Sequence, residues 1–312
     1  MNTSKIITVE ELEEVLGTKF SPAIQKRCSE ISLQYEEISA EERNTYIREV
    51  VEVLARVDAD ADTKPAGEYR LTEWEKGWGE NLEAIRKGKT ANDLIPKYYG
   101  KRKLVRWKQR MIKPSIPDFD YRILSILVDW VVDHYFQKAS HIFEFGCGPA
   151  YHLLRARNYN ANARLIGLDW TKASQDIIQQ VRESGIEKNI EGKNFNFFAP
   201  DYSIEVPAGS AFLTVAALEQ IGDKFEPFLE FIMQKKPSIC AHLEPIDELL
   251  DETNLMDRMS TLYFRKRNYL KGFLPRLRQL SAEGKIKIVA EQRTYSGSFF
   301  IEGHSLIVWY PL

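Results

Sequence analysis

Residues 141–150, HIFEFGCGPA, carry the clearest signal of the fold. The apolar beginning of this stretch is typical of a buried strand, and it runs directly into Gly146 and Gly148, after which a helical pattern begins. Such a strand, glycine turn and helix present backbone N–H groups that a ligand can approach closely. A dinucleotide-binding loop requires a third glycine where this chain has Tyr151. Glu144 instead gives the pattern Glu-x-Gly-x-Gly, which favours a ligand with a cationic end over a pyrophosphate.

Short apolar segments alternate with helical stretches through the second half of the chain. Five segments separated by helices predict a parallel, doubly wound sheet. Two further segments lie too close together for a crossover helix and predict an antiparallel hairpin. We therefore predict an α/β fold within residues 119–312, a doubly wound Rossmann-like seven-stranded sheet with an antiparallel last strand. The expected strands are 141–146, 164–169, 194–199, 211–217, 238–244, 285–292 and 304–310.

Residues 1–118 are predicted to form a helical N-terminal extension that acts as a lid or a substrate platform. Capping boxes at Thr8 and Ser39 each mark the start of a helix. From Pro22 onward an apolar stripe with helical spacing predicts one further helix. The stripe consists of Ile24, Cys28, Ile31, Tyr35 and Ile38.

A later helix of this extension begins near Thr72 and carries Trp74 and Trp78 on one side. Gly77 and Gly79 lie inside it, where each glycine is unfavourable by about 1 kcal/mol. We therefore expect another segment to approach this helix closely at the two glycines.

Composition restricts the class of protein. The 312 residues are 44% hydrophobic, and 43 basic against 45 acidic side chains give a formal net charge of −2. This balance argues against a polycation that coats nucleic acid or an anionic membrane. The sequence has no long uncharged apolar run and no signal-peptide pattern, and Cys28, Cys147 and Cys240 form neither a disulfide framework nor a zinc cluster. We therefore expect a cytoplasmic protein without a membrane partner.

Acidic residues follow the next two expected strands. Asp169 ends the second strand and is followed by Trp170, and Asp201, followed by Tyr202, comes just after the third. In a doubly wound sheet, ligands bind outside the carboxyl ends of the strands. Asp169 is therefore placed to accept hydrogen bonds from both hydroxyls of a ribose, and Asp201 is suited to an exocyclic adenine amine.

The run Glu144-Phe-Gly146-Cys-Gly148, together with Asp169 and Asp201 at these strand ends, resembles the class I S-adenosylmethionine-dependent methyltransferases. The resemblance covers roughly residues 120–312 and includes the terminal hairpin, which distinguishes that family from other doubly wound folds. It implies S-adenosyl-L-methionine as the cofactor. The residues it implies at the cofactor are Glu144 near the amino group or at the loop, Gly146 and Gly148 beside the methionine moiety, Asp169 on the ribose, Trp170 against the adenine face and Asp201 at the adenine. Cys147 and Tyr202, next to these residues, are also expected in the cofactor site.

The same rim of strand ends carries candidates for a catalytic base. His304 is the first candidate, because only histidine titrates near neutrality without a shifted pKa; the alternative is a hairpin-end residue with no catalytic role. Glu219 and Glu244 follow as bases or as hydrogen-bonding groups that orient the substrate. His242 lies in mid-strand and is expected in the core. With Glu219 and Glu244 it shows no metal-ligand motif, so no metal is predicted.

Two stretches of the chain are basic and contain no acid. One runs from Lys97 to Lys113 and the other from Arg265 to Arg278. The first comprises Lys97, Lys101, Arg102, Lys103, Arg106, Lys108, Arg110 and Lys113, with Tyr98, Tyr99 and Trp107 among them, and the second Arg265, Lys266, Arg267, Lys271, Arg276 and Arg278. They predict either a cationic, partly aromatic wall for an anionic substrate or two solvated faces.

The function that the resemblance implies is methyl transfer from S-adenosylmethionine. Residues 217–222, ALEQIG, and 243–245, LEP, are similar to small-molecule and sugar-type O-methyltransferases. We therefore expect O-methylation of a small or medium-sized metabolite, which is anionic if the basic stretches form a wall of its site. The alternatives are a methyltransferase that acts on RNA or a peptide, and a non-catalytic regulatory protein that binds the cofactor. The sequence does not predict the oligomeric state.

Overall fold

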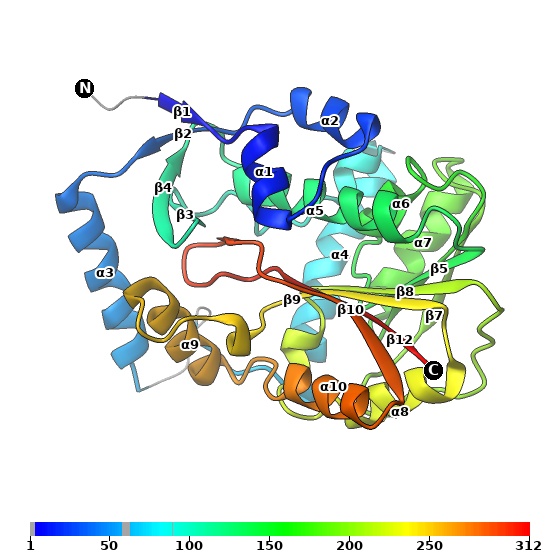
Figure 1. Ribbon diagram of the computed structural model, residues 1–312. Helices are drawn as coiled ribbons and strands as arrows, with labels where there is room; N and C mark the ends of the chain where they lie inside the picture. Colours follow the sequence, from blue (N-terminus) through cyan, green and yellow to red (C-terminus); the bar gives the residue numbers. More distant parts are fainter. Residues whose placement is uncertain (1–3, 58–62, 89) are drawn as a thin grey trace.

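The computed structural model describes residues 4–57, 63–88 and 90–312 (Figure 1). A seven-stranded sheet has the order β10-β12-β9-β8-β5-β6-β7. Strands β5 to β9 pair in parallel, whereas β12 is antiparallel to both β9 and β10. The strands are β5 (His141–Phe145), β6 (Arg164–Asp169), β7 (Ile190–Asn194), β8 (Ser210–Val215), β9 (Ile239–Glu244), β10 (Ile286–Gln292) and β12 (Ser305–Pro311). The predicted seven-stranded sheet with a reversed last strand is confirmed.

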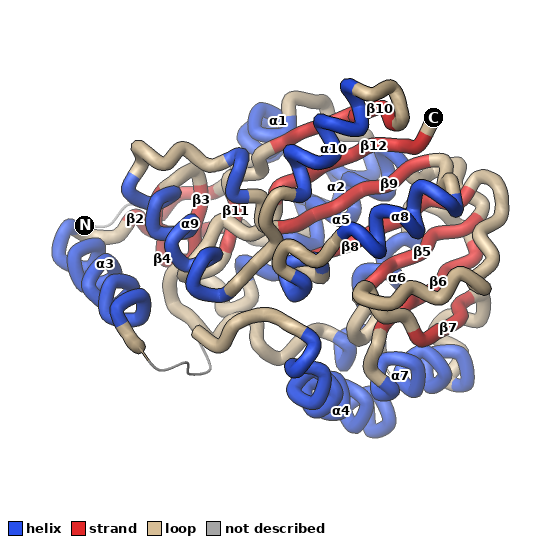
Figure 2. The backbone as a smooth tube through the Cα atoms, turned by 90° about the horizontal axis from the view of Figure 1, so that it is seen from below, coloured by secondary structure: helices blue, strands red, loops and turns tan. Residues whose placement is uncertain are grey.

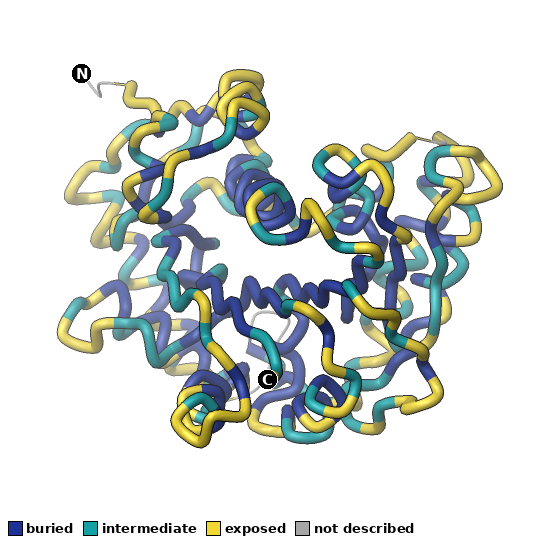
Figure 3. Tube along the Cα trace, turned by 45° about the vertical axis from the view of Figure 1, so that its right-hand side comes forward, coloured by how far each residue is buried: buried dark blue, intermediate teal, exposed yellow. Residues whose placement is uncertain are grey.

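Helices cover both faces of this sheet. On one face are α5 (Phe119–Tyr135), α6 (Tyr151–Ala156) and α7 (Lys172–Glu183), and on the other are α8 (Glu226–Lys235) and α10 (Phe273–Ala282). Successive side chains of a strand point to opposite faces, so Ile142 packs in the first core and Phe143 in the second. Figure 3 shows the buried strands in the middle of the molecule.

The third strand lies earlier in the chain than the sequence predicted. Strand β7 ends at Asn194, so the expected strand 194–199 is wrong and its phenylalanines belong to a loop. Phe195 and Phe197 pack edge-on against Phe228 of α8, with ring centroids 5.9 and 4.8 Å apart. The apolar character of this segment therefore reflects contacts with a helix. The true strand is less apolar because β7 is the edge of the sheet.

The N-terminal region contains both helices and a second sheet. The helices α1 (Val9–Leu16), α2 (Pro22–Ser29), α3 (Ala40–Ala55) and α4 (Leu71–Gly88) are present, with capping boxes at Thr8 and Ser39. However, β1 (Ser4–Ile6), β2 (Gln34–Glu37), β3 (Val105–Trp107) and β4 (Arg110–Pro114) join β11 (Ser296–Gly297) in a five-stranded sheet. The predicted helices are therefore present, but the extension is only partly helical because it also contains strands that the sequence analysis did not predict.

The long stripe beginning at Ile24 shows why the second sheet was missed. The helix ends at Ser29, and Tyr35 belongs to β2. Ile31, Leu33 and Tyr35 are all buried. Their spacing of two residues is the period of a strand. The predicted helical stripe included Ile31 and Tyr35 but not Leu33, so this period was missed.

Strand β11 lies in the connection between β10 and β12, so the C-terminal hairpin reaches into the N-terminal sheet. The five-stranded sheet thus combines four strands from residues 1–118 with β11 from residues 119–312, across the predicted domain boundary. The helix α9 (Leu255–Arg267) packs against α3, and α4 lies along α7 (Figure 2). Short 3-10 turns are η1 (Glu68–Arg70), η2 (Ala91–Leu94), η3 (Leu218–Ile221) and η4 (Asp247–Leu249). Among the described residues, no helix is both long and apolar enough to cross a membrane.

Candidate functional site

The turn after β5 is shaped by its two glycines. Gly146 and Gly148 have φ values of 69° and 49°, a region that glycine enters at little cost. Space restricts the same positions. A Cβ on Gly146 would lie 2.5 Å from Ala217 Cβ, and one on Gly148 would lie 2.8 Å from the Trp78 ring. The loop therefore fits closely between η3 and α4.

Asp169, at the end of β6, joins this loop to the start of α7. Its Oδ2 accepts a hydrogen bond from the Gly148 N–H at 2.9 Å. Its Oδ1 accepts from the N–H and the hydroxyl of Thr171, at 2.9 and 2.7 Å. Burial raises the pKa of Asp169, opposed by these bonds. The carboxylate thus fixes both turns.

Glu144 in β5 and Cys147 within the glycine loop are both buried. Glu144 is 1% exposed, its Oε2 has no hydrogen-bond partner in the described part of the chain, and burial raises its pKa well above the usual range. Cys147 is buried, and burial raises the pKa of its thiol well above its usual value. Cys147 is therefore a neutral space-filling group, and burial favours the neutral form of Glu144 as well.

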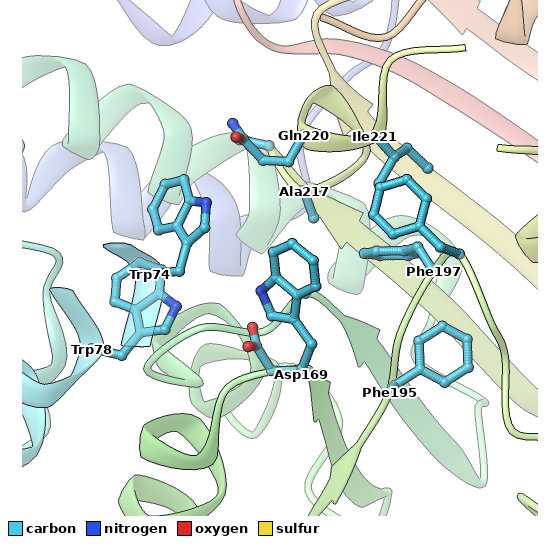
Figure 4. Close-up of a pocket in the computed structure, with 12 residues that line it drawn as sticks. Trp74, Trp78, Asp169, Phe195, Phe197, Ala217, Gln220 and Ile221 are labelled. Carbon is cyan, nitrogen blue, oxygen red and sulfur yellow. The ribbon is translucent and has the colours of Figure 1, made fainter. Parts of the chain in front are cut away.

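A cavity opens between the glycine loop, α4 and the segment after β7, and we call it the glycine-loop cavity. Its volume is about 60 Å³. Trp74 and Trp78 face Phe197 across it, with Asp169 between them (Figure 4). It is lined by Trp74, Trp78, Gly146, Asp169, Trp170, Phe195, Phe197, Phe198, Ala216, Ala217, Gln220 and Ile221.

The helix α4, whose tryptophans line this cavity, is held by polar contacts. The Glu75 carboxylate accepts from the N–H groups of Lys172 and Ala173 at 2.7 and 2.9 Å, at the N-terminus of α7. The expected close approach at the helix glycines is wrong, because a Cβ on Gly77 or Gly79 would meet nothing within 4 Å. No sequence motif marked the tryptophans as cavity residues; the signal was their i, i+4 spacing on a polar helix.

Asp201 and Tyr202 do not line the glycine-loop cavity. Nor do they line the larger, neighbouring cavity that is described next. Asp201 is exposed, and its Oδ1 accepts from the Ser203 N–H at 2.8 Å. Tyr202 is 40% exposed. Their expected position depended on a strand over 194–199. Since β7 ends at Asn194, they lie further from the sheet than predicted.

The larger cavity, which we call the tyrosine-lined cavity, has a volume of about 520 Å³. It shares Trp74, Ala216 and Gln220 with the glycine-loop cavity, so the two adjoin. Its walls are Arg70, Trp74, Tyr98, Tyr99, Gly100, Lys101, Arg102, Leu104, Asp120, Ala216, Glu219, Gln220, Tyr263, Arg267, Tyr269, Ser298, Phe299, Phe300, Ile301, Gly303 and His304.

The predicted base candidates occupy different environments. Glu219 lines the tyrosine-lined cavity, and burial raises its pKa to about 7 against the influence of Arg267. His304 lines the same cavity, and burial lowers its pKa to about 4. Glu244 is fully buried and accepts from the N–H groups of Ala217 and Glu219 at 3.0 and 3.3 Å. Burial raises the pKa of Glu244 to about 8. Glu244 therefore stabilises the start of η3 by accepting hydrogen bonds from its backbone.

His242 is a core residue. Its Nδ1 lies 3.0 Å from Thr214 Oγ1, and its Nε2 accepts from the Trp309 indole at 2.9 Å. Across the described ranges, His, Cys, Asp and Glu side chains form no group of three or more that could hold a metal ion.

Most cations of the two basic stretches bind elsewhere in the protein. Arg106 is buried and donates to Tyr46, Ser260 and two backbone carbonyls. Arg276 pairs with Glu226, and Arg278 with Glu291. A wall built from both whole stretches is therefore wrong. Lys101, Arg102 and Arg267 do line the tyrosine-lined cavity, together with Arg70, which lies outside both stretches.

No protein-family model and no curated protein matches the chain. Among solved structures, it is similar to an O-methyltransferase family protein from Burkholderia thailandensis, at a TM-score of 0.46 and 12% identity, over 96% of this chain and 75% of that one. It is also similar to the N-methyltransferase NodS from Bradyrhizobium japonicum WM9 in complex with S-adenosyl-L-homocysteine, at 0.45 and 10%, over 62% and 87%.

A third similar structure is the O-methyltransferase NcsB1 from neocarzinostatin biosynthesis, in complex with S-adenosylmethionine and 2-hydroxy-5-methyl naphthoic acid. Its TM-score is 0.44 at 14% identity, over 88% of this chain and 86% of that one. All three TM-scores lie below 0.5. The fold assignment therefore rests on the observed strand order and the reversed β12, the arrangement that the sequence resemblance implies.

Proposed function

We propose that this protein transfers the methyl group of S-adenosylmethionine to a hydroxyl oxygen of a small or medium-sized anionic metabolite. The observation that carries the proposal is the meeting of two cavities at Trp74, Ala216 and Gln220. One cavity holds the glycine loop and Asp169, and the other is aromatic and rich in arginine. A methyl donor in the first and an acceptor in the second would meet at this junction.

The residues of the glycine-loop cavity fit the cofactor. Gly146 lines the cavity without a side chain, and Asp169 lines it as well, so both can face a bound nucleoside. Glu144 lines neither cavity; it lies two residues before Gly146, and its buried Oε2 has no hydrogen-bond partner in the described part of the chain. When bound, S-adenosylmethionine supplies a methyl group on a positively charged sulfur. The aromatic side chains around the cavity keep water away from that centre.

The tyrosine-lined cavity suits a small anionic acceptor. Its volume of about 520 Å³ lies within the range of roughly 300–1,000 Å³ of small-molecule sites, which favours a metabolite over an RNA chain or a peptide. Arg267 is 5% exposed, and its guanidinium lies 5.3 Å from the Tyr269 ring centroid. Arg70 lines the same cavity. The two guanidinium groups would attract an ionised acid group on the acceptor.

Residues 1–118 contribute to both cavities, and we propose that they form the lid and substrate platform. Trp74 and Trp78 of α4 stand over the glycine loop. Tyr98, Tyr99 and Arg102 enclose the tyrosine-lined cavity. Placing the acceptor in line with the methyl group can supply much of the rate enhancement, and these walls are positioned to do that.

The test is to identify the ligands of the full chain. Mass spectrometry of the purified protein should find S-adenosylmethionine or its demethylated product. Incubation with methyl-labelled S-adenosylmethionine and a small-molecule extract should then label an anionic metabolite. Arg267→Gln should raise the KM for that acceptor, whereas the exposed Arg182→Gln on α7 should not. Bound cofactor without turnover would favour a regulatory protein, and failure to bind S-adenosylmethionine would contradict the proposal.

A further inference from the structure

A chain of hydrogen bonds ends on Glu219 at the junction of the two cavities. Arg70 Nη1 donates to Gln220 Oε1 at 2.9 Å, and Gln220 Nε2 donates to Glu219 Oε1 at 2.7 Å. From behind, Glu244 accepts the Glu219 N–H at 3.3 Å. Both ends of Glu219, its backbone and its carboxylate, are therefore fixed. A carboxylate offers about four acceptor positions, so these contacts leave room for a substrate hydroxyl.

The position of Glu219 agrees with a role in proton transfer. Gln220 lines both cavities, and Glu219 lines the tyrosine-lined cavity next to it. An acceptor that reaches the junction would thus bring its reacting hydroxyl close to this carboxylate. His304 lies in the same cavity but is a weak base, with its pKa lowered by burial to about 4. A base with a pKa near the working pH is more effective.

We propose that Glu219 is the general base of the methyl transfer and that Gln220, held by Arg70, is its positioning residue. This inference rests on the function proposed above. The hydroxyl proton passes to the Glu219 carboxylate as the new oxygen–carbon bond forms. The carbon–sulfur bond breaks at the same time, and its electron pair remains on the sulfur. Glu219 then returns the proton to solvent.

The charged and titratable groups that face Glu219 come from several elements. Arg70 of η1 and Arg267 of α9 favour its ionised form, as do the hydrogen bonds from Gln220 and Tyr269. The negative charge of Glu219 raises the pKa of Glu244 of β9 and that of the nearby Tyr98. Burial has the largest influence on Glu219 itself and raises its pKa to about 7. Removing the Gln220 donor removes a bond to the ionised form, so the pKa must rise further.

The first test follows the ionisation of Glu219 directly. The full chain is labelled with ¹³C at the glutamate carboxyl carbons and titrated by NMR, with Glu219→Gln to assign the signal. We expect a midpoint near 7, moved up by about 0.5–1 unit in Gln220→Leu, since one hydrogen bond is worth about 1 kcal/mol. Gln220→Glu keeps the size of the side chain and should raise the midpoint at least as much.

A matched control is Gln279→Leu, because Gln279 Nε2 also donates to a glutamate, Glu283, at 2.9 Å, but on the exposed face of α10. It should leave the Glu219 midpoint unchanged. A Glu219 midpoint below pH 5, or one that moves in neither Gln220 variant, would overturn the inference.

The second test measures kcat against pH with the acceptor identified above. Glu219→Gln should lower kcat about 100-fold and abolish the acid limb of the profile, with S-adenosylmethionine affinity retained. Gln220→Leu should move that limb to higher pH, a change that a merely structural role would not produce. Full kcat in Glu219→Gln overturns this inference alone. If the unaltered chain transfers no methyl group, the proposed function itself fails.

Discussion

At the scale of single residues, Asp169 joins the glycine loop to the start of α7 and faces the glycine-loop cavity. Replacing it with alanine removes the predicted ribose acceptor and releases the Gly148 N–H. We expect Asp169→Ala to weaken S-adenosylmethionine binding by about 1.5–3 kcal/mol, the range for hydrogen bonds to a charged group. Calorimetric titration of the folded variant measures this change.

Asp201→Ala is the control for that measurement. The resemblance implied Asp201 at the adenine, whereas the structure places it in an exposed turn with Ser203. Its replacement should leave the affinity for S-adenosylmethionine unchanged. Weakened binding in Asp201→Ala together with normal binding in Asp169→Ala would contradict the assignment of the cavity.

His304 gives a second prediction at this scale. Burial lowers its pKa to about 4, so it is neutral and weakly basic at pH 7. We expect His304→Ala to lower kcat less than about tenfold and to leave the acid limb of the pH profile in place. If the limb disappeared in this variant while Glu219→Gln kept it, His304 would be the base.

At the scale of elements, α4 decides access to the glycine-loop cavity. The cavity measures about 60 Å³, far less than the roughly 300 Å³ of the smallest usual ligand sites, so Trp74 and Trp78 must move to admit a nucleoside. Glu75 holds the helix to the N-terminus of α7. Because a lost helix cap costs about 1–2 kcal/mol, Glu75→Ala should speed dissociation of S-adenosylmethionine roughly 5- to 30-fold, measured by stopped-flow tryptophan fluorescence.

The control for Glu75→Ala lies on the same helix. Glu80 is exposed, and its backbone carbonyl, which alanine keeps, accepts a hydrogen bond from Lys97. S-adenosylmethionine should therefore dissociate from Glu80→Ala at the normal rate. Equal rates in the two variants would show that the contact with α7 does not restrain α4.

Sequence patterns predict some elements of this fold and not others. Most strands of the central sheet could be predicted because they are short apolar runs, as at His141–Phe145. Strand β7, with the sequence IEGKN, has no such run. The loop after β7 could not be predicted, because Phe195 and Phe197 are apolar through contacts with α8. Nor could Trp78 be placed, since its partner Gly148 lies far along the chain.

At the scale of the whole molecule, the N-terminal region and the C-terminal hairpin form one structure. Ser296 of β11 pairs with Trp107 of β3, and Tyr46 of α3 donates to the Phe299 carbonyl at 3.0 Å. Such pairings join segments far apart in sequence, and local periodicity carries no signal for them. For the same reason Arg106 was expected in a cationic wall, although it is a buried donor between α3 and α9.

Buried carboxyl groups give the molecule a characteristic dependence on pH. Burial raises the pKa of Glu244 to about 8 and that of Glu219 to about 7, whereas an unfolded glutamate has a pKa of about 4.3. The folded protein therefore holds more protons than the unfolded chain between these values. Buried histidines act in the opposite sense, since the pKa values of His152 and His242 fall to about 3, but their contribution ends above the unfolded pKa of about 6.5.

The free energy of unfolding should therefore fall as the pH rises from 6.5 to 8. Each carboxyl group that stays protonated only in the folded state contributes up to about 1.4 kcal/mol per pH unit. Urea unfolding without cofactor at the two pH values measures the fall, and Glu244→Gln should reduce it because that side chain no longer ionises. A chain that is more stable at pH 8, or a slope unaltered in Glu244→Gln, would mean that the carboxyl behind η3 is ionised in the folded protein.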